Sequence, residues 1–181
     1  MIISQQKRKE NIAEYILYMW QTEDQIRSLG FDKHEIEDII ISKYDVSPSA
    51  KVDIRKWYAD LMQMMDAEGI QKTGHLQIIK NIIIDLYDLH LRLLDMPAET
   101  QYQKRYTEAL PHIQSLEKKM QNKSINEIDV CMHGLYAVLL LRLSNKEVSE
   151  GTTLAVKSFS SLMALLSQKY KEREKNPAKY I

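Results

Sequence analysis

TGHLQIIKNIIIDLYDLHLRLLD, residues 73–95, is the stretch that decides the fold. At about 100° per residue, its apolar side chains fall on one face of a helix. They are Ile78, Ile79, Ile82, Ile83, Leu86, Leu89 and Leu93. The opposite face is polar and carries Gln77, Asn81, Asp85, Asp88 and Arg92. This division predicts a helix that packs its apolar face against a protein core.

Composition extends the helical prediction to the whole chain. The 181 residues include only 5 Gly and 4 Pro, against about 7% and 5% in an average protein. A β-sandwich or an α/β fold needs frequent turns, and Gly and Pro make many of them. Apolar residues at 44% and charged residues at 28% are typical of a folded chain. We expect a single all-α domain over residues 1–181, and the competing arrangement is two helical subdomains hinged at Met96-Pro97.

Start and stop signals divide the chain into about seven helices. We expect them over residues 4–29, 32–44, 47–68, 73–95, 99–121, 124–143 and 149–175. The residues that signal these starts and ends are Ser4, Asp32, Ser47, Thr73, Ser124 and Ser149, then Gly30, Gly69 and Pro97. Pro111 lies inside the fifth helix and either kinks it or breaks it at Leu110. The sixth helix is apolar around nearly its whole circumference, which predicts a buried helix at the centre of a bundle.

Net charge and the single cysteine bear on partners and location. The 25 basic and 25 acidic side chains cancel, so no overall field attracts nucleic acid or an anionic membrane. The longest apolar run, residues 135–141, is far shorter than the ~20 residues that span a bilayer. Cys131 cannot form an internal disulfide, which is typical of a reducing cytoplasm. We expect a cytoplasmic protein that binds neither nucleic acid nor membrane.

Standard catalytic and cofactor motifs are absent from the sequence. There is no phosphate-binding glycine loop, GxSxG, HExxH, paired CxxC or Glu-x-x-His. His75 and His90 both fall near the middle of the apolar face of residues 73–95, but they are roughly 22 Å apart at ~1.5 Å per residue. Because of that separation they cannot share a metal ion. The sequence predicts neither a metal nor a cofactor.

Five ionisable residues on faces that should be buried are the candidate ligand-binding residues. Glu23 and Arg27 project from the apolar face of the first helix, one turn apart. Glu68 ends the apolar stripe of the third helix, and a short loop separates it from His75, so we expect these two within hydrogen-bonding or one-water reach. We expect all four in one polar pocket between the first, third and fourth helices, and His90 is the fifth candidate. Such a cluster is either a satisfied structural network or a site for a polar ligand, and the sequence does not decide between them.

Several short motifs carry a family resemblance. They occupy residues 14–21 (EYILYMWQ), 57–65, 68–69, 74–77, 89–90, 135–136 and 149–155. Together they resemble an uncharacterised domain-of-unknown-function family of the Bacteroidetes, and the similarity extends over essentially the whole chain. The resemblance implies a compact, all-helical, cytoplasmic bacterial protein, and it implies no catalytic activity.

Three functions fit these observations. The first is a non-enzymatic interaction or scaffolding protein that binds an unknown protein partner, or forms a homodimer, through an amphipathic helix face. The second is a binder of a small polar or anionic ligand that uses Arg27 and His75. The third is an enzyme with Glu68 and His75 as an acid–base pair. No nucleophile, metal motif or cofactor motif supports the third, so the sequence favours a non-enzymatic role.

Overall fold

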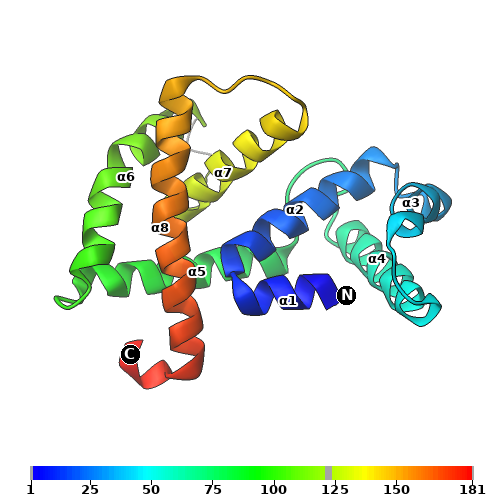
Figure 1. Ribbon diagram of the computed structural model, residues 1–181, viewed down its shortest axis with the longest axis horizontal. Coiled ribbons are helices and arrows are strands. Elements are labelled where there is room, and N and C mark those ends of the chain that lie inside the picture. The colour runs from blue at the N-terminus through cyan, green and yellow to red at the C-terminus, as the bar shows by residue number, and fades with distance from the viewer. Residues whose placement is uncertain (1, 121–123, 181) are drawn as a thin grey trace. The chain divides into compact units, whose positions relative to one another are not determined.

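Helices make up all the regular structure in residues 2–120 and 124–180, the part of the chain that this computed structural model describes (Figure 1). In chain order they are α1 (Ile2–Glu10), α2 (Ile12–Ser28), α3 (Lys33–Ile39), the 3-10 helix η1 (Ile41–Lys43), α4 (Pro48–Ala67), α5 (Gln77–Asp95), α6 (Thr100–Lys119), α7 (Glu127–Leu143), α8 (Glu150–Lys175) and the 3-10 helix η2 (Pro177–Tyr180). The all-α prediction is confirmed. Within these residues, no helix has both the length and the apolar character needed to cross a membrane.

The first predicted helix is two helices that meet at Asn11. Helix α1 ends at Glu10 and α2 begins at Ile12. The Asn11 side-chain oxygen accepts a hydrogen bond from the backbone N–H of Ala13 at 3.1 Å. An asparagine in this role satisfies one of the free N–H groups that begin a helix. A break of this kind adds one α-helix to the predicted seven.

Local capping signals correctly place most of the other helix ends. The side chains of Asp32, Ser47 and Ser149 each accept a hydrogen bond from a backbone N–H in the first turn of α3, α4 and α8. Gly30 and Gly69 follow α2 and α4 with φ angles of 61° and 68°. This left-handed conformation costs glycine little, which is why glycine commonly follows the last helical residue.

Three predicted boundaries differ from the structure. The second predicted helix ends as α3 at Ile39 and continues only as η1. Helix α5 begins at Gln77 rather than near Thr73. The cap of α7 is Asn126 rather than Ser124, because the Asn126 side chain is the one that accepts from the backbone N–H of Asp129.

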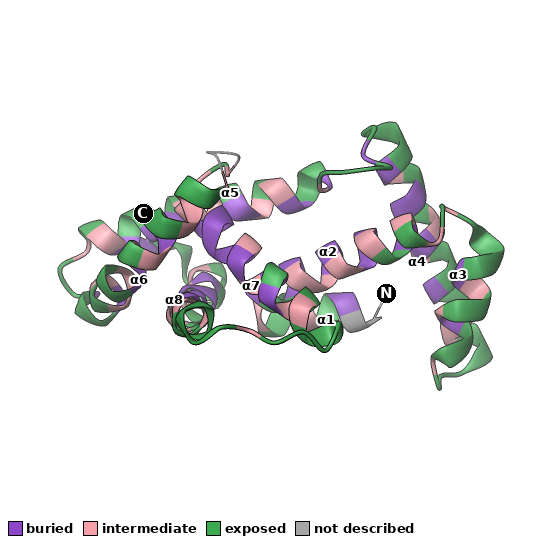
Figure 2. Ribbon diagram, turned by 90° about the horizontal axis from the view of Figure 1, so that it is seen from above, coloured by how far each residue is buried: buried purple, intermediate pink, exposed green. Residues whose placement is uncertain are grey.

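The chain divides into two compact units, and the divisions fall inside α1, α2 and α5. The N-terminal unit comprises Met1–Lys9 and Glu14–Asn81, and the C-terminal unit comprises Glu10–Ala13 and Ile82–Ile181. Each unit contains its own set of buried apolar side chains (Figure 2). The last division lies between residues 81 and 82, and none of the divisions falls at Met96-Pro97. A single domain over residues 1–181 stays a prediction.

In the C-terminal unit, α6, α7 and α8 pack against one another (Figure 1). Helix α6 continues through Pro111 without a break, so the alternative of two helices separated at Leu110 is wrong. Helix α7 is the predicted sixth helix, and most of its first three turns are buried, whereas Leu143 at its end is exposed. The three helices approach closely at Gly134, where an added Cβ would lie 2.7 Å from Phe159 and 2.9 Å from Leu116.

In the N-terminal unit, η1 contacts both α3 and α4. Ile36 of α3 and Ile41 of η1 are buried, as are Tyr58 and Met62 of α4. These contacts make α3, η1 and α4 a helical hairpin whose outer surface is hollowed.

Candidate functional site

Glu23 of α2 is the centre of a buried polar network in the N-terminal unit. Its side chain is fully buried. Oε1 accepts a hydrogen bond from the backbone N–H of Leu76 at 3.1 Å, and Oε2 lies 2.6 Å from Nδ1 of His75. Because an ionised carboxylate only accepts hydrogen bonds, Nδ1 carries the ring hydrogen and donates it. Both oxygens of a buried carboxylate are thereby satisfied, as burial requires.

Arg27, one turn after Glu23, binds the same segment of chain through its carbonyl groups. The Arg27 Nε–H donates to the carbonyl oxygen of Ile70 at 3.3 Å, and one terminal N–H donates to the carbonyl oxygen of Gly74. A second terminal nitrogen lies 2.7 Å from a carboxylate oxygen of Asp24. The guanidinium also lies 3.8 Å from Glu23. The predicted neighbourhood of Glu23, Arg27 and His75 is therefore present.

Together, the two side chains of α2 hold the connection between α4 and α5. Glu23 accepts hydrogen bonds from N–H groups of this connection, and Arg27 donates hydrogen bonds to its carbonyl groups. The connection is irregular, so backbone groups such as the carbonyls of Ile70 and Gly74 and the N–H of Leu76 need partners outside it. The His75 ring also stacks on Trp20, with ring centres 4.2 Å apart and planes inclined by 16°. This arrangement places the connection against α2.

Glu68 does not take the enclosed position expected for it beside His75. It is exposed, and its carboxylate accepts a hydrogen bond at 2.7 Å from the backbone N–H of Gln77, the first residue of α5. The cause is local: α4 ends at Ala67, and Gly69 then reverses the chain. Glu68 therefore reaches the positive N-terminal end of α5. The carboxylate that meets His75 is Glu23.

His90, the fifth candidate, lies in the C-terminal unit in a separate cluster. Its side chain is fully buried, and Nδ1 lies 2.7 Å from the hydroxyl oxygen of Tyr102. Nε2 lies 3.4 Å from a carboxylate oxygen of Glu127, too far for a good hydrogen bond. The Tyr106 hydroxyl donates to that carboxylate at 2.9 Å. Nε2 thus has no hydrogen-bond partner in the described chain.

Burial decides the charge state of His90. Desolvation lowers the pKa of His90 below its usual value, and the nearby charge of Glu127 opposes this only in part. The imidazole is therefore neutral at pH 7. The simplest tautomer has its hydrogen on Nε2, facing Glu127, and accepts the Tyr102 hydroxyl hydrogen at Nδ1. Such a group can hold α5 to α6 and α7, and it couples the stability of this unit to pH.

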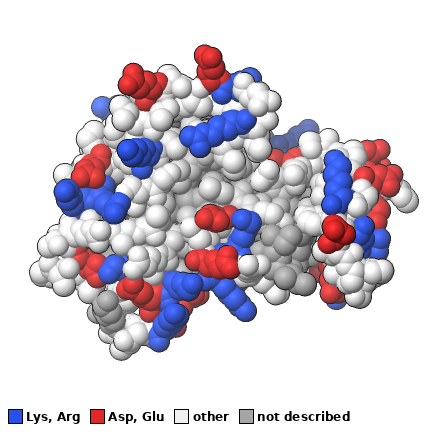
Figure 3. Space-filling view, in the orientation of Figure 1, with Lys and Arg blue, Asp and Glu red and all other residues white. Residues whose placement is uncertain are grey.

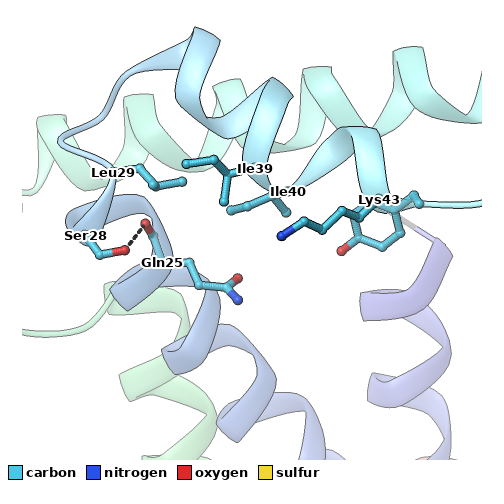
Figure 4. A pocket seen from close by; sticks show the side chains of 7 residues that line it. Gln25, Ser28, Leu29, Ile39, Ile40 and Lys43 are labelled. Carbon is cyan, nitrogen blue, oxygen red and sulfur yellow. Dashed lines mark hydrogen bonds between the residues drawn. The ribbon is translucent and has the colours of Figure 1, made fainter. Parts of the chain in front are cut away.

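Among the hollows on the surface of the N-terminal unit are three whose lining includes none of Glu23, Arg27, His75 and Glu68. The first, of about 330 Å³, lies between the end of α2 and the α3–η1 segment (Figure 4). The second, of about 400 Å³, lies between α3 and α4. The third, of about 670 Å³, continues along α4 and shares Lys33, Ala59 and Met62 with the second. We call the second and third hollows together the α3–α4 groove.

The groove residues were not among the sequence candidates. Val52 and Lys56 are exposed on α4, and Lys33 is exposed on α3. One signal was available in the sequence: Val52 stands among the polar residues of α4, and it is 58% exposed. An isolated apolar residue on a polar face is common, however, and only the neighbouring α3 turns this one into the wall of a groove.

The structure and sequence together define an all-helical protein with a buried Glu–His–Arg network and a surface groove. Within residues 2–120 and 124–180, no group of three or more His, Cys, Asp or Glu side chains is placed to hold a metal ion. Residues 1–177 match the family model of the domain of unknown function DUF4924, and the chain belongs to that family. No curated protein matches the chain, and no solved structure matches it.

Proposed function

We propose that this chain is a non-enzymatic interaction protein whose α3–α4 groove binds an amphipathic, acidic helix of a protein partner. The observation that carries the proposal is the groove itself, which combines an apolar lining, exposed at Val52, with basic residues at its rim. The protein works in the cytoplasm in this proposal, and its lone Cys131, which is buried, is compatible with a reducing compartment.

The walls of the groove are apolar and come from two helices. Ile36 and Ile41 line it from the α3–η1 side, and Val52, Tyr58 and Met62 line it from α4. Val52 is 58% exposed, so a partner that covered it would remove apolar surface from water. One leucine side chain buried in such a hollow contributes about 1.5–3 kcal/mol. The walls therefore favour apolar anchors.

The rim of the second hollow carries positive charge that the chain itself does not neutralise. Lys33 and Lys56 both line the hollow, and in the described residues neither forms an ion pair. Arg55 and Glu37 also line it, but they neutralise one another through two hydrogen bonds of 2.6 and 2.7 Å. The two free lysines favour a partner with carboxylates beside its apolar residues. Each exposed pair would add roughly 0.2–1 kcal/mol and would weaken as salt is added.

The length of the groove fits a helix. Its lining residues on α4 run from Val52 to Asp66, which is about 21 Å at ~1.5 Å per residue. A helix of about 14 residues has the same length and can place apolar side chains every three or four residues along it. Asp60 and Asp66 line the far part of the groove, so the matching end of the partner helix should be basic or neutral.

The polar network is better explained as structure than as a site. Glu23, Arg27 and His75 are engaged by one another and by the backbone of residues 70–76, so a small polar ligand there would have to displace the chain's own groups. Glu68, the proposed acid–base partner of His75, binds Gln77 instead. The protein's charges also favour a protein partner over nucleic acid, because on the face shown in Figure 3 basic side chains lie among acidic ones.

The test uses a defined peptide and the full chain. The probe is a fluorescein-labelled helical peptide of about 14 residues, with leucines at helical spacing and glutamates beside them near one end. Fluorescence polarisation should show binding that weakens with salt. Val52→Glu should weaken it about tenfold, or 1.4 kcal/mol, and Lys56→Glu about threefold. Lys157→Glu, at an exposed position on α8, is the matched control and should have no effect.

Three results would overturn the proposal. The first is equal binding of a peptide with lysine in place of every glutamate. The second is binding unchanged by Val52→Glu. The third is a dimer in sedimentation experiments that Val52→Glu dissociates, because the groove would then hold a second copy of this chain.

A further inference from the structure

The first hollow differs from the groove in its chemistry. It lies between the last turns of α2 and the α3–η1 segment, and its volume is about 330 Å³ (Figure 4). This is at the lower end of the range for ligand pockets, ~300–1,000 Å³. Its lining combines an apolar surface with one charged group, and it contains no carboxylate.

The apolar part of the hollow comes from both sides. Leu29 lines it from the end of α2, and Ile39 and Ile40 line it from α3 and the residue that follows (Figure 4). Ile39 is 41% exposed, so part of its side chain faces water. A short hydrocarbon chain placed against these three residues would cover surface that now faces water.

The polar part consists of Lys43 and Gln25. Figure 4 shows the Lys43 ammonium group extending into the hollow on the side of Gln25. Neither side chain forms a hydrogen bond or an ion pair with any other residue that the structure describes. Ser28 also lines the hollow, but its hydroxyl hydrogen is donated to the carbonyl oxygen of Gln25 at 2.9 Å. The free donors are therefore one ammonium and one amide.

The residue after Lys43 also lines the hollow. It is Tyr44, which lies close to Tyr18 of α2 and to Tyr58 of α4. The end of η1, from which the Lys43 side chain extends, also contacts α4.

We propose that this hollow binds a small aliphatic monocarboxylate. Lys43 and Gln25 donate to the two carboxylate oxygens, and the hydrocarbon chain lies on Leu29, Ile39 and Ile40. A single cation matches a single negative charge. The partial negative charge at the C-terminal end of α2 opposes any anion here, and it opposes a phosphate dianion more strongly than a monocarboxylate. This site is independent of the partner groove.

The test is a titration of the full chain with sodium isovalerate, followed by amide NMR. Shifts should concentrate at residues 25–29 and 39–44. Lys43→Met, which keeps the length of the side chain and removes its charge, should weaken binding at least tenfold. Ile39→Asp should do the same by placing a like charge beside the carboxylate. Lys157→Met is the matched control and should bind as the unaltered protein does. Both test positions are exposed, and far-UV circular dichroism would verify that the variants fold.

The neutral amide of the same acid and inorganic phosphate complete the test. Isovaleramide should bind at least tenfold more weakly than isovalerate, because it lacks the charge that Lys43 recognises. Phosphate should bind more weakly as well, because it has no hydrocarbon chain. The proposal is overturned if isovalerate shifts no residue around the hollow, if Lys43→Met binds it equally well, or if phosphate binds as tightly as isovalerate.

Discussion

Replacing Glu23 with Ala removes the acceptor on which the α4–α5 connection depends. The buried N–H of Leu76 would lose its partner, at a cost of about 1–3 kcal/mol. The His75 Nδ1–H, now 2.6 Å from the carboxylate, would lose a charge-assisted bond of about 1.5–3 kcal/mol. The two contributions share one side chain and are not additive, so we expect a loss of ~3–5 kcal/mol in the free energy of unfolding.

Glu23→Gln separates the charge from the hydrogen bonds. The amide oxygen can still accept from Leu76, and the amide nitrogen can donate to Nδ1 of His75 once the ring hydrogen moves to Nε2. Glu23→Gln removes only the contribution of the negative charge to these hydrogen bonds, so we expect the free energy of unfolding to fall by about 1 kcal/mol. Glu14→Ala, on an exposed carboxylate of the same helix, should cost less than ~1 kcal/mol.

Denaturant unfolding can measure these differences in the free energy of unfolding of the N-terminal unit. Both tryptophans of the chain, Trp20 and Trp57, lie in the N-terminal unit, so their fluorescence follows its unfolding. Amide hydrogen exchange should also show lost protection at residues 70–76 in Glu23→Ala. A Glu23→Ala protein within ~0.5 kcal/mol of the original, with residues 70–76 still protected, would refute the structural role of the network.

Three further predictions concern the C-terminal unit. Gly134→Ala should lower the free energy of unfolding by ~1–3 kcal/mol in circular dichroism melts, because its Cβ would meet Phe159 at 2.7 Å; a gain in stability would contradict this close packing. Burial lowers the pKa of His90 in the folded protein, so below pH ~6.5 the unfolded state binds more protons than the folded state. The free energy of unfolding should therefore fall between pH 7 and pH 5, by at most about 1.4 kcal/mol per pH unit. His90→Gln should reduce that fall, and an unchanged pH profile would exclude His90 as its source. Burial also raises the pKa of Cys131, so iodoacetamide should alkylate it slowly in the native protein and rapidly in denaturant; equal rates would show that the thiol is accessible.

The helices were predictable because their signals act over short distances. Asp32, Ser47 and Ser149 each bond to a backbone N–H two or three residues ahead. Amphipathic periodicity similarly depends on residues within a few turns. The boundary error at the start of α7 arose because Ser124 and Asn126 are both good capping residues, and their separation of two residues is too small for a sequence pattern to resolve.

The candidate site was predictable only as a neighbourhood. Glu23, Arg27 and His75 could be recognised as polar residues on faces that become buried. Which carboxylate meets His75 could not be read from spacing, because Glu23 lies 52 residues away and Glu68 only a short loop away. The outcome depends on the chain reversal at Gly69 and on which backbone groups the connection turns toward α2.

The sequence by itself determined that the chain is helical, where most helices begin and end, and which faces are apolar. Only the tertiary structure shows the hollows around α3 and the reason why glycine fits at position 134. By helix propensity, alanine would be the better residue at position 134 by ~1 kcal/mol. The structure reverses that preference, because side chains of α6 and α8 occupy the space that a Cβ needs. Propensities and caps act between neighbours along the chain, whereas close packing depends on atoms that only the complete fold brings together.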